Sequence, residues 1–194
     1  MFKNIKVSIL AIMAAVLFSA CNFGNSNSSE KEKATTTQEE NISTKKEEKE
    51  NKSKNLREAP QFEVTTIEGE KVSLEVSLAD NKPMMIYFTA SWCPMCAQNW
   101  PAISEVYPEY KDKVNFVAIS IDPTDNKEVM TKLAKEKNLD FPLVKGTPQV
   151  MIDFGVNSQA TTVGVNKEGF VEFQKDKKVL SADEYRDLFE QLIN

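Results

Sequence analysis

The chain has 194 residues, a formal net charge of −5 and no histidine. Its length fits one ordinary domain with some unstructured chain, and it is short for two domains with separate cores. Acidic and basic residues are mixed along the sequence, so no concentrated basic surface exists for nucleic acid, and we expect no nucleic-acid partner. The absence of histidine excludes a Cys-His dyad and a histidine metal site.

The first 20 residues have the pattern of a secretory signal peptide. A basic start precedes an apolar run at 7–18, whose length of about 12 residues is too short to cross a membrane. The segment ends in LFSAC, which resembles a bacterial lipoprotein processing box with Phe18 in place of the usual leucine. Such a box makes Cys21 the acylated N-terminus, and an ordinary cleaved signal is the alternative. Acylation of Cys21 leaves the other two cysteines as an even pair.

Residues 21–58 form a polar stretch that follows the signal. Apart from Cys21 it consists largely of Asn, Ser, Thr, Lys and Glu, and it cannot bury enough apolar surface to offset its ordering entropy. We expect a disordered tether with an r.m.s. reach on the order of 35 Å. The folded domain is then expected at 59–194.

The predicted domain starts with a hairpin, a buried strand and a helix. Strands at 62–67 and 71–74 flank a Glu-Gly turn. The apolar run MMIYFTA at 84–90 suits a strand that is buried on both faces. After the cysteines, a segment as far as about Tyr110 can be helical, and we expect Pro101 to interrupt it.

A further strand and helix follow the cysteine helix. The run VNFVAISI at 114–121 predicts a strand. Asp125 and Glu128 have capping-box spacing at the start of an amphipathic helix. We expect the apolar side of this helix to carry Val129, Leu133 and Ala134.

The last third of the chain predicts short elements and a final helix. An extended segment at 141–144 and one or two helical turns at 149–154 precede a second hairpin with strands at 161–166 and 170–173. Strands that alternate with helices indicate an α/β domain with a central sheet covered on both faces. The final helix has its predicted cap and apolar side at Ser181, Glu184, Tyr185, Leu188, Phe189 and Leu192.

The two domain cysteines stand as Cys-Pro-Met-Cys directly after the buried strand. Zinc ribbons use the same spacing, but a structural zinc site needs two more soft ligands, and the sequence supplies none within the domain. We therefore expect no metal. A purely structural disulfide is an alternative, although closing so short a loop constrains the unfolded chain little. Redox chemistry is the favoured interpretation.

Helix geometry assigns different roles to the two cysteines. At the N-cap, the Cys93 sulfur faces unpaired N–H groups and the positive end of the helix dipole, which favour the thiolate. Cys93 is therefore the expected nucleophile. Pro94 falls at the first helical position, where its missing N–H costs nothing. Cys96 lies on the same face of the first turn and is the expected resolving thiol.

The segments YFTASWCPMC, AISID and FGVNSQATTVGVNKEG together resemble the membrane-tethered thiol-disulfide oxidoreductases of the TlpA/ResA type, within the AhpC/TSA-redoxin superfamily. The resemblance extends from about residue 59 to the C-terminus. It implies a thioredoxin-like fold, in which helices flank a central mixed β-sheet, and turnover through a mixed disulfide with no cofactor. It also implies protein disulfides as substrates, a reductase direction and a membrane electron donor.

Three positions depart from the pattern of this type. Asn99 stands where many members carry a glutamate that aids proton transfer, and Tyr87 stands where thioredoxin has a buried aspartate. Ala160 occupies the position of a cis-proline that faces the disulfide. A cis bond before a non-proline residue costs about 2.5–4 kcal/mol, so we predict that the Gln159–Ala160 bond is trans, or strained if cis.

The resemblance also places the substrate beside the disulfide. The residue before the family proline lends its backbone to an extended substrate, which makes Gln159 the expected contact here. Trp92, Pro94 and Ala160 complete the expected substrate-binding set. Met95 lies between the cysteines and carries no charge to hold the thiolate, so we expect a moderate reduction potential rather than a strongly oxidising one.

Two other functions compete with this interpretation. A peroxiredoxin-like peroxidase needs a threonine three residues before its cysteine and a nearby arginine. Ala90 stands at that threonine position, and arginine occurs only at 57 and 186. A non-enzymatic binding lipoprotein, such as a copper carrier, is the second alternative, although such carriers also use histidine.

Overall fold

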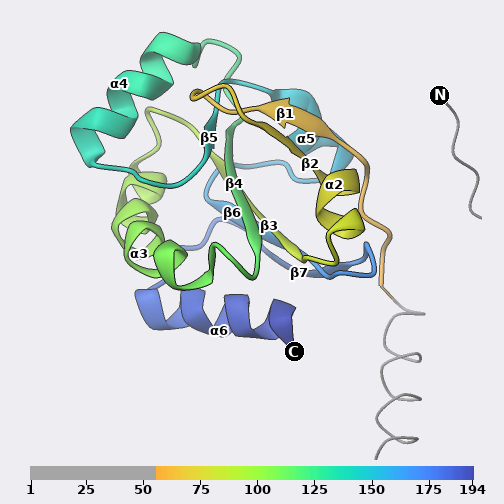
Figure 1. Ribbon diagram of the computed structural model, residues 1–194. Helices are drawn as coiled ribbons and strands as arrows, with labels where there is room; N and C mark the ends of the chain where they lie inside the picture. Colours follow the sequence, from red (N-terminus) through yellow and green to blue (C-terminus); the bar gives the residue numbers. More distant parts are fainter. Residues whose placement is uncertain (1–55) are drawn as a thin grey trace, which may run out of the picture. The chain divides into compact units, whose positions relative to one another are not determined.

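The computed structural model describes residues 56–194 of the chain (Figure 1). The predicted signal peptide, Cys21 and the tether as far as residue 55 lie outside the described residues. The described elements, in chain order, are β1 (Glu63–Thr65), β2 (Lys71–Ser73), α2 (Leu74–Ala79), β3 (Met84–Thr89), α3 (Pro94–Tyr110), β4 (Asn115–Ser120), α4 (Lys127–Lys137), β5 (Leu143–Val144), α5 (Pro148–Asp153), β6 (Thr161–Val165), β7 (Val171–Lys175) and α6 (Ala182–Ile193).

Five strands form one mixed sheet in the order β5-β4-β3-β6-β7. β4 runs parallel to its neighbours β3 and β5, whereas β6 runs antiparallel to β3 and β7. β3 lies in the middle of the sheet, and all six of its residues are buried, as its continuous apolar sequence predicts. The expected α/β fold with a central mixed sheet is confirmed.

The side chains of β3 alternate between two buried clusters, one on each face of the sheet. Met85 and Tyr87 belong to the cluster that contains both domain cysteines, and α3, α4 and α6 contribute to it. Met84, Ile86 and Phe88 belong to the other cluster, which includes side chains from α2, α5 and the N-terminal hairpin. Figure 1 shows α3 and α6 next to each other, in agreement with their many contacts. The cysteines therefore lie on the α3 side of the sheet.

The predicted N-terminal hairpin is present as β1 and β2, which form a separate antiparallel pair. Thr66 makes a bridge to Val144 in β5, so the hairpin contacts the edge of the main sheet. Arg57, which precedes the predicted start of the domain, already makes contacts with the fold. Its guanidinium donates to the Phe154 carbonyl at 2.9 Å, and its own carbonyl accepts from the Val171 N–H at 2.8 Å.

The predicted interruption of the cysteine helix is wrong. α3 continues from Pro94 to Tyr110 with both Pro101 and Pro108 inside it. A proline within a helix removes only its own N–H bond and crowds the preceding turn. Here the buried side chains of Trp100 and Ile103, on either side of Pro101, pack against the sheet and keep the helix continuous.

The predicted cap of α4 is also wrong, by one residue. Asn126 rather than Asp125 caps this helix, because its side chain accepts from the Val129 N–H at 2.9 Å. Val129, which was expected on the apolar side, is 37% exposed, whereas Met130 is buried in its place. Leu133 is buried and Ala134 packs against the core, as predicted.

The short helix α2 was not predicted, and the other elements agree with the sequence predictions. β5 and α5 fall in the segments predicted as extended and helical, and β6 and β7 form the second hairpin. Ser181 and Glu184 form the capping box of α6. No helix among residues 56–194 is both long and apolar enough to cross a bilayer. The buried residues of α6 are Tyr185, Leu188, Phe189 and Leu192.

Candidate active site

Cys93 and Cys96 form a disulfide at the N-terminus of α3. Cys93 is the N-cap residue, with an extended backbone, and Pro94 occupies the first turn. The two Cα atoms are 5.2 Å apart, and the Cys96 N–H donates to the Cys93 sulfur at 3.1 Å. Cys96 is fully buried, and the small residual exposure of 2% belongs to Cys93. The predicted helix-start geometry is thus present.

Trp92 lies beside this disulfide as an exposed platform. Its side chain is 58% exposed, and its indole N–H donates to Asp122 at 2.6 Å. Asp122 also accepts from the Thr124 hydroxyl and N–H, at 2.7 and 2.8 Å. The Thr124 bonds, and then the bond from Trp92, lower the pKa of Asp122 below its ordinary value. The ring is therefore fixed by a charged acceptor while its apolar face meets solvent.

Asp125 is hydrogen-bonded to the turn that leads into Cys93, a contact that the sequence analysis did not predict. The side chain is only 2% exposed. Its carboxylate accepts from the Ser91 N–H at 2.8 Å, the Ser91 hydroxyl at 2.6 Å and the Ser120 hydroxyl at 2.5 Å. The carboxyl ends of the parallel strands β3 and β4 meet at one edge of the sheet, and Asp125 joins the loops that follow them. In the sequence, the serines at the ends of these two strands were the only indication of a shared acceptor in this region.

Asn99 lies one helical turn beyond Cys96, and both the NH₂ group and the oxygen of its amide make hydrogen bonds. Its NH₂ donates to the carbonyls of Met95 and Lys178, at 3.0 and 2.9 Å. Its oxygen accepts from the Leu180 N–H and the Tyr185 hydroxyl, both at 3.0 Å. An amide is neither an acid nor a base near neutral pH, so this residue holds the segment 178–180 against α3 and supplies no proton acceptor.

Tyr87 occupies the position that corresponds to the buried aspartate of thioredoxin. Its side chain is fully buried next to Asn99 and Tyr185, and its hydroxyl has no hydrogen-bond partner of good geometry among the described residues. Burial raises the pKa of Tyr87 far above its ordinary value, so the hydroxyl keeps its proton. Neither Tyr87 nor Asn99 can therefore act as the base for Cys96.

Ala160 belongs to the same buried cluster as both cysteines. Its φ is +57°, in the left-handed region that side chains rarely adopt. Its carbonyl accepts from the Lys178 N–H at 3.0 Å, and the adjacent Gln159 is partly exposed. A proline, whose φ stays near −65°, does not fit this backbone. Whether the Gln159–Ala160 bond is trans stays a prediction.

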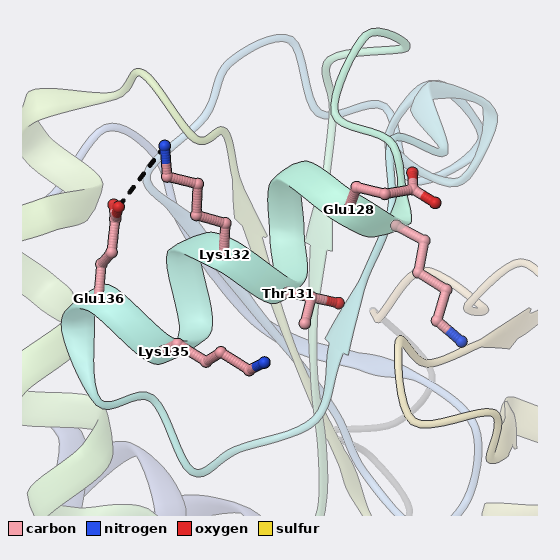
Figure 2. Close-up of a pocket in the computed structure, with 6 residues that line it drawn as sticks. Glu128, Thr131, Lys132, Lys135 and Glu136 are labelled. Carbon is pink, nitrogen blue, oxygen red and sulfur yellow. Dashed lines mark ion pairs between the residues drawn. The ribbon is translucent and has the colours of Figure 1, made fainter.

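A shallow pocket on α4 lies outside this site. Figure 2 shows that it is lined by charged and polar side chains of one helix, with an ion pair of 3.7 Å between Lys132 and Glu136. None of the predicted site residues lines it. Within residues 56–194, no group of three or more Cys, Asp or Glu side chains could hold a metal ion. The pocket lining is Lys127, Glu128, Thr131, Lys132, Lys135 and Glu136.

Comparison with known proteins gives a family and named relatives. The model of the AhpC/TSA family matches residues 56–180, which is more than half of the chain. Thioredoxin-like protein YneN of Bacillus subtilis is 31% identical over 117 residues, which cover 60% of this chain and 68% of YneN. The thiol-disulfide oxidoreductase ResA of Bacillus thuringiensis subsp. konkukian is 33% identical over 126 residues, which cover 63% of this chain and 70% of ResA.

A solved structure supports the same assignment. The crystal structure of StoA from Bacillus subtilis superimposes with a TM-score of 0.58 at 25% identity, and the match covers 68% of this chain and 96% of StoA. The fold is therefore thioredoxin-like. Together with the cysteine pair at the start of α3, the family match and the named relatives lead to one conclusion. The chain belongs to the AhpC/TSA family and is a thiol-disulfide oxidoreductase.

Proposed function

We propose that this protein reduces disulfide bonds in exported proteins, with Cys93 as the nucleophile and Cys96 as the resolving thiol. The observation that carries the proposal is the position of Cys93 at the N-cap of α3, where its sulfur accepts the Cys96 N–H at 3.1 Å. A hydrogen bond and the helix dipole both favour a thiolate at this position. The reduced protein would thus present a reactive sulfur at the residue with residual exposure.

The reaction proceeds through two exchange steps. The Cys93 thiolate attacks a substrate disulfide, which forms a mixed disulfide and releases one substrate sulfur as a thiolate that takes up a proton. Cys96 then loses its proton and attacks the Cys93 sulfur, which releases the second substrate thiol and forms the Cys93–Cys96 disulfide. Two electrons have passed to the substrate. A membrane donor must return two electrons before the next cycle.

The proton of Cys96 has no carboxylate acceptor at Asn99, where many members of the TlpA/ResA type carry one, or at Tyr87, where thioredoxin carries one. Asn99 is committed to four hydrogen bonds, and the buried Tyr87 hydroxyl keeps its own proton. Water, or the substrate thiolate released in the first step, would therefore accept this proton. We expect resolution of the mixed disulfide to be the slower of the two steps.

Substrate segments would lie across the surface between Trp92 and Gln159. Trp92 offers an apolar ring fixed by Asp122, and Pro94 is exposed beside it. The partly exposed Gln159 would lend its backbone to an extended peptide, while Ala160 forms the buried floor next to the sulfurs. This arrangement fits unfolded or flexible chain around a substrate cysteine.

The peroxidase alternative has less support from the described contacts. Arg57 donates to the Phe154 carbonyl on the other side of the sheet, and Arg186 is bonded to acidic side chains of α3 and α6. Neither arginine is placed to activate a peroxide at Cys93. Ala90, at the position of the peroxidase threonine, offers no hydroxyl.

Location at the outer face of a membrane, through acylated Cys21, is the second part of the proposal. Its support is the signal-like sequence of residues 1–20 and the LFSAC box. In intact cells, Cys21→Ser should move the protein from the membrane fraction to the soluble fraction while its cysteine chemistry is unchanged. Retention of the variant in the membrane fraction would exclude the acyl anchor.

The resolving-thiol assignment can be tested with a disulfide-containing peptide. Cys96→Ser should accumulate a covalent mixed disulfide between Cys93 and the peptide, whereas Cys93→Ser should form none and lose the activity. Mass spectrometry of alkylated, non-reduced samples identifies the adduct. Full activity of Cys93→Ser would reject the proposed mechanism, and the binding-lipoprotein alternative predicts no adduct with either variant.

A further inference from the structure

The carboxylate of Asp125 is buried, although it neither caps a helix nor forms an ion pair within residues 56–194. Removing a charged group from water is costly unless hydrogen bonds compensate for it. Asn126 caps α4, so this role does not explain Asp125. All three hydrogen bonds of its carboxylate go instead to Ser91 and Ser120, at the ends of β3 and β4.

The position of Asp125 is itself held firmly. Its carbonyl accepts from the Gly146 N–H at 2.7 Å, and its own N–H donates to the Asp122 carbonyl at 3.0 Å. Ser91 is thereby held at both its N–H and its hydroxyl by a group on a neighbouring loop. Charge-assisted bonds of this kind are roughly twice as strong as neutral ones.

The held serine lies inside the turn that presents the nucleophile. The Cys93 N–H donates to the Ala90 carbonyl at 3.1 Å, so Ser91 and Trp92 are the central residues of that turn. If Ser91 were released, the turn could open and Cys93 could leave the N-cap. The bond from the Cys96 N–H to the Cys93 sulfur would then be lost, together with its stabilisation of the thiolate.

We propose that Asp125 is a positioning residue of the redox site, whose buried carboxylate fixes the turn from Ala90 to Cys93 and so keeps the Cys93 thiolate at the N-terminus of α3. The inference rests on Cys93 being the nucleophile, as the proposed function has it. Asp125 does not touch the substrate, and it acts through Ser91 alone.

The test measures the pH dependence of Cys93 alkylation by iodoacetamide in the reduced full-length protein, with the labelled cysteine identified by mass spectrometry. Asp125→Ala should raise the pKa of Cys93 towards the about 8.5 of a free thiol. The alkylation rate at pH 7 should fall by about threefold or more. Asp125→Asn keeps one acceptor oxygen for the Ser91 N–H but loses the charge and the second acceptor oxygen, so it should restore only part of the rate.

Arg186→Gln is the matched control, because Arg186 stabilises the distant end of α3 and does not contact the turn. It should lower the stability and leave the Cys93 profile unchanged. If Asp125→Ala loses stability but keeps the wild-type profile, Asp125 is merely structural and the proposal is wrong.

A second variant covers the case in which Asp125→Ala does not fold. The double change Ser91→Ala and Ser120→Ala removes two of the three donors and keeps the Ser91 N–H. It should also raise the pKa of Cys93, and an unchanged profile would overturn the proposal. Alkylation requires no substrate, so the result stands even if the proposed direction of electron flow is wrong.

Discussion

Ala160 holds the left-handed backbone conformation beside the disulfide with φ at +57°. For a residue with a Cβ atom this region costs roughly 1–2 kcal/mol. The cost is offset here by burial in the cysteine cluster and by the bond from the Lys178 N–H. The loop thus reaches the active site without the proline that the family pattern places there.

We predict that Ala160→Pro lowers the free energy of unfolding by at least about 2 kcal/mol, because proline cannot adopt a positive φ. Ala160→Gly is the control, since glycine adopts this φ freely and should stay within about 1 kcal/mol of the wild type. Urea unfolding of the oxidised proteins measures both values. A proline variant as stable as the wild type would show that the loop rearranges readily.

Single residues could be placed from the sequence where their contacts are with residues close by in the chain. The cap position of Cys93, with Pro94 after it and Cys96 one turn on, follows from four consecutive residues. Asp125 was assigned to the wrong partner, because its donor Ser91 is 34 positions away and no local pattern predicts their contact. The interpretation of Asp125 as a cap used the nearest helix, which Asn126 in fact caps.

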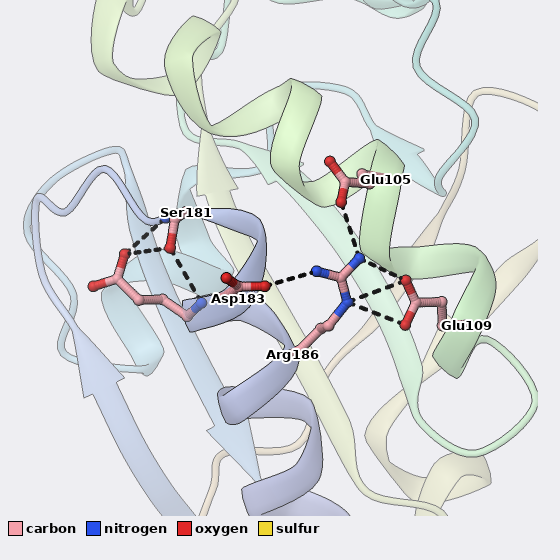
Figure 3. A network of polar contacts seen from close by, with 6 residues as sticks. Glu105, Glu109, Ser181, Asp183 and Arg186 are labelled. Carbon is pink, nitrogen blue, oxygen red and sulfur yellow. Dashed lines mark hydrogen bonds and ion pairs between the residues drawn. The ribbon is translucent and has the colours of Figure 1, made fainter.

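At the scale of the elements, two groups of polar contacts help to hold α3 against the C-terminal part of the domain, beside the packing of Tyr110 on Phe189 and its bond to Glu190. The first is Asn99, which binds the segment 178–180 and the Tyr185 hydroxyl of α6. The second is Arg186 of α6, whose guanidinium bonds to Glu105 and Glu109 of α3 and to Asp183 (Figure 3). Asn99 lies beside the disulfide, whereas Arg186 holds the distal half of α3.

Asn99→Ala should lower the free energy of unfolding by about 2–4 kcal/mol. The change leaves the Leu180 N–H without its acceptor and removes the bond between the Tyr185 hydroxyl and the Asn99 oxygen. An unsatisfied buried group costs about 1–3 kcal/mol, and a lost hydrogen bond adds about 1 kcal/mol. Gln98→Ala is the matched control, because Gln98 is exposed and should change stability by less than about 0.5 kcal/mol. Denaturant unfolding measures both, and equal effects would contradict the assigned role of Asn99.

Arg186→Gln should lower the melting temperature at pH 7, and the loss should become smaller at high salt because both ion pairs are partly exposed to solvent. A hydrogen bond from Arg186 lowers the pKa of Glu109 below its ordinary value of 4.5. A carboxyl group whose pKa is lowered by folding stabilises the folded state at pH values above its unfolded-state pKa. This contribution to stability is lost as the pH falls and the group becomes protonated. The difference between variant and wild type should therefore diminish below about pH 4.5 in calorimetric scans. If the difference in melting temperature did not change with pH, the ion pairs of Arg186 would not be its cause.

Most elements could be predicted because their signals are local. The all-apolar β3 and the capping box of α6 are read directly from adjacent residues. The break predicted at Pro101 is absent, because the packing of Trp100 and Ile103 outweighs the tendency of proline to interrupt a helix. On α4, packing against the sheet buries Met130 and leaves Val129 exposed, which the local pattern does not determine.

At the scale of the whole molecule, the sheet topology creates the site. The parallel pairing of β3 with β4 brings the two following loops to one edge, where Asp125 joins Ser91 to Ser120 and Asp122 holds Trp92. Apart from α2, residue patterns indicated the described strands and helices in order, but they do not specify which strands pair. The mixed sheet was expected only from the family resemblance, and the strand order β5-β4-β3-β6-β7 required the structure.

The reduction potential of the Cys93–Cys96 couple tests the proposed function most directly. The protein is equilibrated with defined glutathione and dithiothreitol buffers, and the thiol and disulfide forms are quantified after alkylation. Met95 is neutral and supplies no cation to the thiolate, so we predict a reversible two-electron couple nearer to thioredoxin's about −270 mV than to DsbA's about −120 mV. A potential close to that of DsbA would make the protein an oxidant, and the absence of any reversible couple would contradict the oxidoreductase mechanism itself.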